Sequence, residues 1–476
     1  MKSSHLIVTA LAAVAAVSPA CAQKRDAGAL YLQLCAQCHG RDLQGSEGAP
    51  SMLDDVWKHG GDDATMARVI REGVADTQMP SFRDGLTPAE IRSLIVYIHE
   101  QRAKVKTQGL PEAPKIGSDS IASELHAFRL EVITEDVKTP WSIAWLPDGR
   151  ALVTEKPGGV RIIDQGKLGE PLKGTPEVNT NSQGGMLEVA VHPDYAKNGW
   201  IYLAFSHETR NGQGDAVSMT KLVRGRIKDN TWVDEQSIWT APLETYLSAG
   251  GVHYGCRIAF DGKGYLFFSH GERGRQEQAQ DLKRPNGKIH RIHDDGRIPA
   301  DNPFVNEPGA VPSIWTYGNR NPQGMDIDPR TGGLWAAEHG PRGGDELNII
   351  RKGRNYGWPV ITYGINYNGT PITAETAREG MEQPVTYWTP SIAVCGIDFY
   401  AGELFPQWKG SLLVGALAKE ELRRLVIEDD KVTHQEVLLR NLGRIRDVAT
   451  GPDGAVYILF NSPDRVVRMV PAKPAI

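Results

Sequence analysis

The sequence predicts an all-β body made of six repeated units, preceded by a small all-α domain. Three observations support this. The 476 residues are too many for one ordinary hydrophobic core, so at least two domains are expected. The 51 Gly and 30 Pro, without a low-complexity tract, indicate many tight turns and a β-rich body. After a helical N-terminal region, one hairpin pattern recurs six times, and such a repeat, unable to bury its own faces, is typical of a six-bladed β-propeller.

Residues 1–22 predict a secretory signal peptide. Lys2 gives a positive start, residues 6–17 form an apolar core, and 20–22 are a small-residue cleavage site. A lipoprotein anchor at Cys21 is a poorer interpretation because the preceding residues do not match a lipobox. No later stretch is long and apolar enough to cross a bilayer. We therefore expect a periplasmic or secreted protein without membrane insertion, and the net charge of −5 gives no reason to expect nucleic acid as a partner.

Residues 23–106 are predicted to form the helical domain. Helices are expected over 27–34 and 65–72, and a third begins at residues 87–90, where Thr, Pro, Ala and Glu form a capping box with Pro at the first helical position. Its apolar residues then recur at helical spacing on one face. They are Ile91, Leu94, Ile95 and Ile98.

Two cysteines and a histidine in this domain form an attachment motif for haem c. Cys35 and Cys38 lie on one helical turn and can both bond the haem vinyl groups, and His39 then falls under the iron as its axial ligand. A thioredoxin-like pair or half a zinc site is disfavoured, because no second Cys pair exists. Met79 is the expected second axial ligand, with Met52 and Met66 as competitors. The segment resembles a class I cytochrome c.

Residues 107–124 contain Pro, Gly and Ser without an aromatic residue and are predicted to be a linker to the domain at 125–476. Cys256 and Cys395, in that domain, are permitted to pair in an oxidising compartment, but both look like buried strand residues, which favours free thiols. The six copies of the hairpin pattern cover residues 142–155, 187–206, 257–271, 324–340, 396–417 and 447–460, with Ile143, Val189, Ile258, Met325, Ile397 and Val448 in equivalent positions.

Polar residues recur where the innermost strands begin, at the expected mouth of the central channel. Several are basic, and guanidinium groups there suit a small polyanion, although each alone is more simply a solvated surface charge. The basic set is Arg257, Arg320, Lys419, Arg444 and Arg446, and Gln183, His253 and Asn321 share its register.

Four stretches of the C-terminal domain resemble the soluble quinoprotein glucose and aldose sugar dehydrogenases: residues 250–272, 317–350, 353–359 and 442–454. The similarity spans essentially residues 125–472. It implies a six-bladed propeller that binds pyrroloquinoline quinone (PQQ) and calcium. The tricarboxylated quinone would explain a cationic mouth.

The resemblance also implies residue roles. His253 matches the general base that takes the proton from the sugar C1 hydroxyl, and Gln183 and Arg320 match residues that flank the reacting centre. Trp388 loosely matches a flat wall near the cofactor, and a core Trp is an equally good interpretation. Cofactor contacts are implied for Asn321, Lys419, Arg444 and Arg446 as well as Arg320.

Calcium is implied at two places. The backbone carbonyls of Gly340 and Pro341 match the ion that bridges protein and quinone, and Glu346 and Tyr356 match a second site. The family's acidic residue before the base is replaced here by Val252, which favours the broader aldose-type subgroup.

The sequence thus leads to an exported dehydrogenase that oxidises an aldose to its lactone and passes single electrons to haem c and then to a downstream periplasmic acceptor. Three alternatives stay open. The substrate is another alcohol or a keto-sugar, or the propeller is a calcium-dependent hydrolase or lactonase, or the protein is a non-enzymatic redox sensor.

Overall fold

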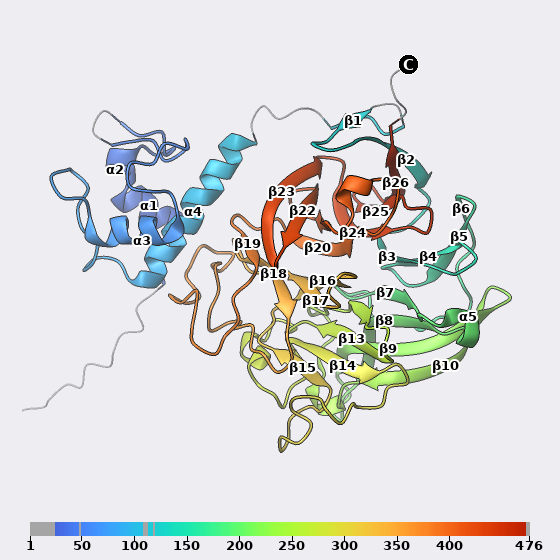
Figure 1. The fold of residues 1–476 in the computed structure, drawn as a ribbon. Coiled ribbons are helices and arrows are strands. Elements are labelled where there is room, and N and C mark those ends of the chain that lie inside the picture. The colour runs from blue at the N-terminus through green and yellow to red at the C-terminus, as the bar shows by residue number, and fades with distance from the viewer. Residues whose placement is uncertain (1–23, 47–48, 108–112, 118–119, 473–476) are drawn as a thin grey trace, which may run out of the picture.

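The computed structural model describes residues 24–46, 49–107, 113–117 and 120–472. It contains a helical domain beside a ring of six β-sheets (Figure 1). The predicted signal peptide at 1–22 lies outside the described residues. No helix among the described residues is long and apolar enough to span a membrane.

The helical domain forms as its local signals predict. Asp26 caps the first helix, and the third predicted helix begins with the expected capping box between Thr87 and Glu90. Leu30, Leu94 and Met66 are buried in one core, so Met66 is a core residue. The helices are α1 (Ala27–Leu34), α2 (Ala36–His39), α3 (Asp63–Glu72) and α4 (Pro88–Lys106).

Six antiparallel sheets follow, and they confirm the six-bladed propeller. Blade 1 has β3 (Pro140–Trp145), β4 (Ala151–Glu155), β5 (Val160–Asp164) and β6 (Lys167–Leu168). Blade 2 has β7 (Met186–Val191), β8 (Ile201–Arg210), β9 (Ala216–Lys228) and β10 (Thr231–Thr240), with β11 (Leu247–Ser248) beside β9. Blade 3 has β12 (Ile258–Phe260), β13 (Tyr265–His270), β14 (Lys288–His293) and β15 (Ile314–Tyr317).

The remaining blades complete the ring. Blade 4 has β16 (Pro322–Ile327), β17 (Leu334–Glu338), β18 (Asp345–Ile350) and β19 (Thr386–Trp388). Blade 5 has β20 (Val394–Phe399), β21 (Leu412–Ala416), β22 (Glu421–Glu428) and β23 (Lys431–Leu439). Blade 6 has β24 (Arg444–Thr450), β25 (Val456–Asn461) and β26 (Arg465–Pro471), joined by β2 (Ala127–Thr134) and β1 (Ile121–Ala122). Short helical turns are α5 (Tyr195–Asn198), η1 (Leu243–Thr245), η2 (Gln276–Ala279) and η3 (Pro406–Trp408).

The first strand of each repeat is the innermost strand of its blade. These strands contact one another in a closed cycle, in the order β3, β7, β12, β16, β20, β24 and back to β3. The turn after β3 needs Gly149 at a φ of +89°, where a side chain would be strained. Each blade is an antiparallel sheet that starts with its innermost strand, so all six innermost strands begin at the same end of the channel. The equivalent apolar positions predicted from the repeats, Ile143, Val189, Ile258, Met325, Ile397 and Val448, all lie on these strands.

The N-terminal strand of the propeller closes the ring. β2 pairs with β26, the last strand of the chain, so blade 6 joins both ends of the domain. The predicted linker is wrong in part, because β1 pairs with β2 and Ile116 and Ile121 pack against the core of blade 6. Its docked part meets a surface about three hundred residues away in the chain, which local composition does not reveal.

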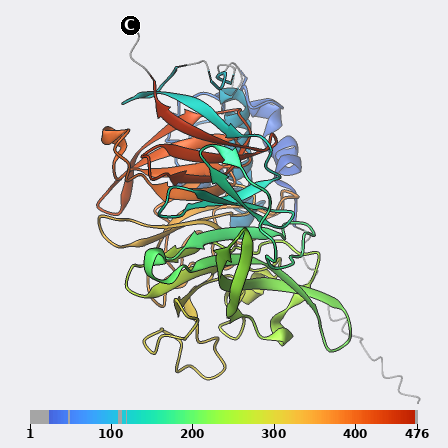
Figure 2. The same ribbon diagram turned by 90° about the vertical axis from the view of Figure 1, so that its right-hand side faces the viewer.

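The helical domain lies at one side of the ring, near β18 and β19 (Figures 1 and 2). Within the propeller, Cys256 and Cys395 are buried and unbonded, which agrees with the prediction of free thiols.

Candidate functional site

The mouth of the channel gathers most of the predicted site residues. Gln183 precedes β7, His253 precedes β12, and Arg320 and Asn321 precede β16. Because the innermost strands all begin at this end, residues far apart in sequence meet. The carbonyl-bearing residues Gly340 and Pro341 follow β17, which is antiparallel to β16 and ends at the same edge.

His253 is held between a glutamine and a glutamate. Its backbone N–H donates to Gln183 Oε1 at 2.8 Å, and its ring Nδ1 lies 2.5 Å from Glu272 Oε1. The His253 ring is largely buried, and this burial lowers its pKa, although the hydrogen bond and charge of Glu272 oppose the effect. A neutral imidazole that donates from Nδ1 keeps Nε2 as a proton acceptor. This pair has the geometry of an oriented general base.

Arg320 is fixed beside this base. Its backbone N–H donates to Glu338 Oε2 at 2.6 Å, and its Nη1 donates to the carbonyls of His339 and Gly340 at 3.1 and 2.7 Å. The guanidinium also lies 5.3 Å from the ring centroid of Trp358 and 6.0 Å from that of the exposed Tyr367. Glu338 and these aromatic rings thus position the charge at the mouth.

The mouth carries positive charge without matching carboxylates. Neither Arg320 nor Arg446 forms an ion pair with a described residue. Arg446 Nη1 contacts neutral partners instead, Gln323 Oε1 at 3.0 Å and Cys395 Sγ at 3.2 Å. Within the described chain, Arg320 Nε, Arg446 Nε and His339 Nε2 are buried without a hydrogen-bond partner. Burial and the nearby guanidinium groups hold the pKa of His339 well below its usual value.

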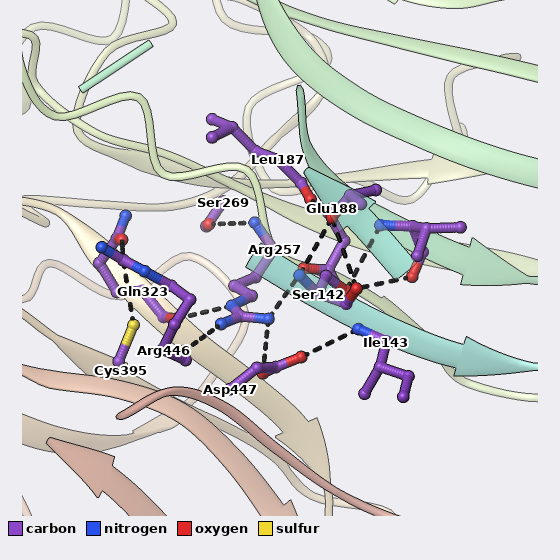
Figure 3. A network of polar contacts seen from close by, with 12 residues as sticks. Ser142, Ile143, Leu187, Glu188, Arg257, Ser269, Gln323, Cys395, Arg446 and Asp447 are labelled. Atoms are coloured by element: carbon purple, nitrogen blue, oxygen red, sulfur yellow. Dashed lines mark hydrogen bonds and ion pairs between the residues drawn. The ribbon is translucent and has the colours of Figure 1, made fainter. Parts of the chain in front are cut away.

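Arg257 does not belong to this free cationic set. Its Nη1 pairs with Glu188 at 2.9 Å and with Asp447 at 2.8 Å, and its Nε donates to the carbonyl of Gln323 (Figure 3). Burial raises the pKa of Glu188 to about 8, against the effect of Arg257. The prediction of Arg257 as an anion-binding residue is therefore wrong, because partners from other blades neutralise it inside the channel.

Trp388 is placed by the structure in the outermost strand of blade 4. It is buried in a core shared by blades 4 and 5, and its indole N–H donates to Gln435 Oε1 at 3.2 Å. This supports a core role and not a wall beside the cofactor.

Lys419 and Arg444 stand at the same end of the ring as the mouth, after β21 and at the start of β24. Lys419 is half-buried and Arg444 exposed, and neither side chain forms an ion pair within the described ranges.

The residues implied for calcium lie at two neighbouring places. The carbonyls of Gly340 and Pro341 accept hydrogen bonds from Arg320 and from the Ser391 hydroxyl. Glu346 lies directly across the sheet from Glu338, and burial together with the Glu338 charge raises its pKa well above the usual value. Tyr356 is buried, and its hydroxyl donates to the carbonyl of Ile349, at the opposite end of β18 from Glu346.

The haem motif of the helical domain spans the α1–α2 junction. Cys35 follows α1, and Cys38 is exposed on α2. His39 Nδ1 lies 3.2 Å from the carbonyl of Pro50, which leaves Nε2 for an iron. Met79 is half-buried in the loop before α4, and its role as second ligand stays a prediction.

Three residues of the mouth escaped the sequence analysis. Glu272 follows β13, His339 follows β17, and Lys156 follows β4, and all of them stand at the end of a blade's second strand. Burial and the charge of Arg446 lower the pKa of Lys156. The second strand of each blade runs toward the mouth. The residues that follow these second strands are therefore candidate site residues, as are the residues that precede the first strands.

A cavity of about 560 Å³ lies at the opposite end of the channel. Its lining includes Asp326, Asp398, Glu403 and Asp453. The two ends of the channel therefore differ in their side chains, with acidic residues in this cavity and guanidinium groups without carboxylate partners at the mouth.

Comparison with known proteins agrees with this geometry. Residues 137–468 match the family model described as glucose/sorbosone dehydrogenase, and residues 22–98 match that of cbb3-type cytochrome c oxidase subunit III. The aldose sugar dehydrogenase YliI of Escherichia coli is 44% identical over 338 residues, 69% of this chain and 89% of the relative.

Two solved structures carry the same fold. The soluble aldose sugar dehydrogenase from Escherichia coli, in its apo form, has 41% identity and a TM-score of 0.68, and the match covers 72% of this chain and 100% of the other. The PQQ-bound aldose sugar dehydrogenase from Streptomyces coelicolor has 26% identity and a TM-score of 0.59, over 72% of this chain and 98% of the other. The family model, the sequence relatives and the solved structures all match the propeller domain to the same family. The chain therefore belongs to the glucose/sorbosone dehydrogenase family, with a cytochrome c domain at its N-terminal side.

Proposed function

We propose that this protein is an exported quinohaemoprotein that oxidises aldose sugars at C1 to lactones, using PQQ and calcium in the propeller and haem c in the helical domain. The observation that carries the proposal is the oriented His253–Glu272 pair beside guanidinium groups that lack carboxylate partners. We further propose a signal peptide at 1–22, a cytochrome domain at 23–106, and a catalytic domain from 125 to the end of the chain.

The mouth fits a polyanionic quinone. The orphaned nitrogens of Arg320, Arg446 and His339 need acceptors that no described residue provides. Carboxylates of PQQ would satisfy them and offset the buried positive charge. Lys419 and Arg444 would add charge, and Asn321 would contribute its amide, although its Oδ1 already accepts from the backbone N–H of Gly255 at 3.1 Å.

The calcium proposals rest on oxygen atoms. The carbonyls of Gly340 and Pro341 each retain a lone pair beside the hydrogen bond that they accept. For the second site, Glu346 has a buried partner, Asn348, whose Oδ1 has no hydrogen-bond donor in the described part of the chain. A cation there would also relieve the repulsion between Glu346 and Glu338.

The side chains of the mouth then act on the sugar. His253 Nε2 takes the C1 hydroxyl proton, while Glu272 accepts from Nδ1–H and orients the ring. Gln183 is anchored by the His253 backbone and is positioned to hold the sugar, and Arg320 stabilises developing negative charge. A quinone bound at the mouth would supply the hydride acceptor for C1, and a calcium ion held by Gly340 and Pro341 would supply Lewis-acid chemistry. His39, with Met79 opposite, would hold the iron that receives single electrons for a downstream periplasmic acceptor.

The test uses anaerobic haem-loaded protein with calcium and PQQ, challenged with a panel of aldoses, keto-sugars and alcohols. We expect aldose-dependent reduction of an external dye and of the haem, and a loss of about 10²–10⁴-fold in His253→Ala, because the base is gone. Quinone binding, followed by fluorescence, should persist in that variant. Unchanged turnover in His253→Ala would refute the assignment of His253 as the base. If keto-sugars or alcohols supported reduction of the dye and the haem and aldoses did not, the assignment of an aldose as substrate would be refuted.

A further inference from the structure

The cytochrome domain and blade 4 form an interface with both polar and apolar contacts. Arg342 of the propeller makes a two-pronged ion pair with Glu100 of α4, with Nε–Oε1 at 2.7 Å and Nη2–Oε2 at 2.5 Å. From the other side, Arg92 of α4 donates from Nε to the carbonyl of Tyr363 at 3.0 Å. Both guanidinium groups are mostly shielded from solvent, so salt screens these contacts less than it screens surface ion pairs.

An apolar centre lies between these polar contacts. Val96 of α4, Ala27 of α1 and Ile365 of the propeller form one buried cluster. Val96 is fully buried although it does not belong to the cytochrome's own core, so the propeller covers it. Glycines permit the close approach, because a Cβ at Gly343 would come within 2.8 Å of Val96 Cγ1, and Gly369 accepts from the Ala27 N–H at 3.1 Å.

A third contact locks the orientation. Tyr363 and Tyr387 of the propeller stack with their ring centroids 3.7 Å apart, and the Tyr387 hydroxyl donates to Asp63 of α3 at 3.4 Å. Asp63 is held in turn by Arg92 and by His99 Nε2. Three elements of the cytochrome, α1, α3 and α4, therefore contact one face of blade 4.

The propeller side of this interface continues into the site. Arg342 and Gly343 belong to the loop 340–344, which begins with Gly340, the residue whose carbonyl contacts Arg320. Arg342 and Ile365 are joined by two backbone hydrogen bonds of 3.1 and 2.9 Å. On the other side of α4, Leu94 and Ile95 are in the core that also contains Cys35. A continuous path of packed protein thus runs from the mouth to the haem motif.

We propose that Glu100–Arg342, Arg92–Tyr363 and the Val96 contact act as a clasp that keeps the cytochrome docked during turnover, so that electrons reach the haem through loop 340–344 and α4. This inference rests on the proposed function. Each sugar oxidised yields two electrons and two protons. Each Fe(III) haem takes one electron to become Fe(II), so the downstream one-electron acceptor must reoxidise the haem within each cycle, and the protons go to water.

The docked position leaves the haem motif accessible to that acceptor. The helix that carries Cys38, α2, lies on the side of the domain away from the propeller, with α4 between them (Figure 1). Electrons therefore enter on the α4 side and leave on the α2 side without undocking.

The test is charge reversal with rescue. Glu100→Arg places like charges beside Arg342, so the attraction that holds the two domains at this point becomes repulsion. In oxidised haem-loaded protein without PQQ, we expect faster amide exchange in α4 and in residues 363–369. With PQQ, calcium and an aldose, haem reduction should slow by about tenfold or more while dye reduction stays unchanged. Arg342→Glu in the same chain should restore both readouts.

Two further variants exclude trivial explanations. Val96→Glu places a charge in the apolar centre of the clasp, outside the core of the cytochrome domain. It should accelerate amide exchange and slow haem reduction as Glu100→Arg does, with an unchanged haem spectrum. Arg71→Ala removes an exposed arginine of the same domain that pairs with its neighbour Glu72, and it should change neither readout. Wild-type exchange and haem reduction in Glu100→Arg and Val96→Glu would overturn the clasp. Failure of the proposed function would appear differently, as a wild-type protein whose dye reduction does not respond to sugar.

Discussion

At the scale of single residues, the catalytic proposal depends on the protonation state of His253. Burial lowers its pKa below the usual value of 6.5, and Glu272 raises it again in part. A protonated imidazole cannot accept the C1 proton. The rate should therefore rise with pH through a pKa below 6.5 and stay level above it.

Removing the glutamate charge tests this balance. In Glu272→Gln, the ring loses an anionic acceptor that both orients it and raises its pKa. We expect kcat to fall by about 10²-fold or more and the acid limb of the kcat/KM profile to move to lower pH. A pH–rate profile against dye reduction measures both. A limb that moves to higher pH would contradict the proposed pairing.

The sequence predicted some residues of the site and missed others for physical reasons. The strand register brought His253, Gln183 and Arg320 to one end of the channel, as expected. A position in the repeat does not show which side chains of other blades will pair with a charged residue. Arg257 shares it, yet Glu188 and Asp447 neutralise it from other blades.

At the scale of elements, local signals were sufficient wherever the stabilising contacts are local. The capping box of α4 is an example, since Thr87 Oγ1 accepts from the Glu90 N–H at 3.3 Å and Glu90 accepts from the Thr87 N–H. The hairpins could also be predicted from the sequence, because the alternation of apolar and polar residues and the turn residues lie within each repeat. The docked part of the linker was not, because β1 and Ile116 depend on partners from both ends of the propeller.

The cap also predicts a stability change in the cytochrome domain. Thr87→Ala leaves the Glu90 N–H without its acceptor and should lower the free energy of unfolding of that domain by about 1 kcal/mol. Denaturant titration followed at the haem absorbance measures this. Arg68→Ala, an exposed position within α3, is the control and should change little. Equal effects of the two changes would argue against the cap.

At the scale of the whole molecule, the channel is tied together by a buried charge. Arg257, before β12, contacts Glu188 of β7, Asp447 and the Arg446 carbonyl of β24, and the Gln323 carbonyl of β16. One side chain thus joins four blades. Removing one partner from such a buried group leaves the other charges uncompensated.

Arg257→Met should therefore lower stability by about 3–5 kcal/mol. Without the guanidinium, the pKa values of Glu188 and Asp447 rise further above those of the unfolded chain, so the folded state binds more protons than the unfolded state. Because the pKa of Glu188 is already about 8 in the wild-type protein, the extra loss of stability from this residue should grow as pH rises from about 7 to 9. Thermal unfolding of wild type and variant across that range gives the comparison, and a pH-independent difference would contradict it.

The closure of the ring depends on contacts between the two ends of the propeller domain. β2 comes from the start of the propeller and β26 from its end, and Phe128 of β2 packs edge-on against Trp408 at 5.9 Å between ring centroids. Phe128 is fully buried, so Phe128→Ala should cost about 3–5 kcal/mol. Because Phe128 belongs to the same buried cluster as Val467 and Met469 of β26, amide exchange should accelerate in β2 and β26 together, more than in blades 2 and 3. Val132→Ala in the same strand, 45% exposed, should have little effect on either measurement. If Phe128→Ala loosened β2 alone, the N-terminal strand would be an accessory of blade 6, and the ring would be closed by its innermost strands without it.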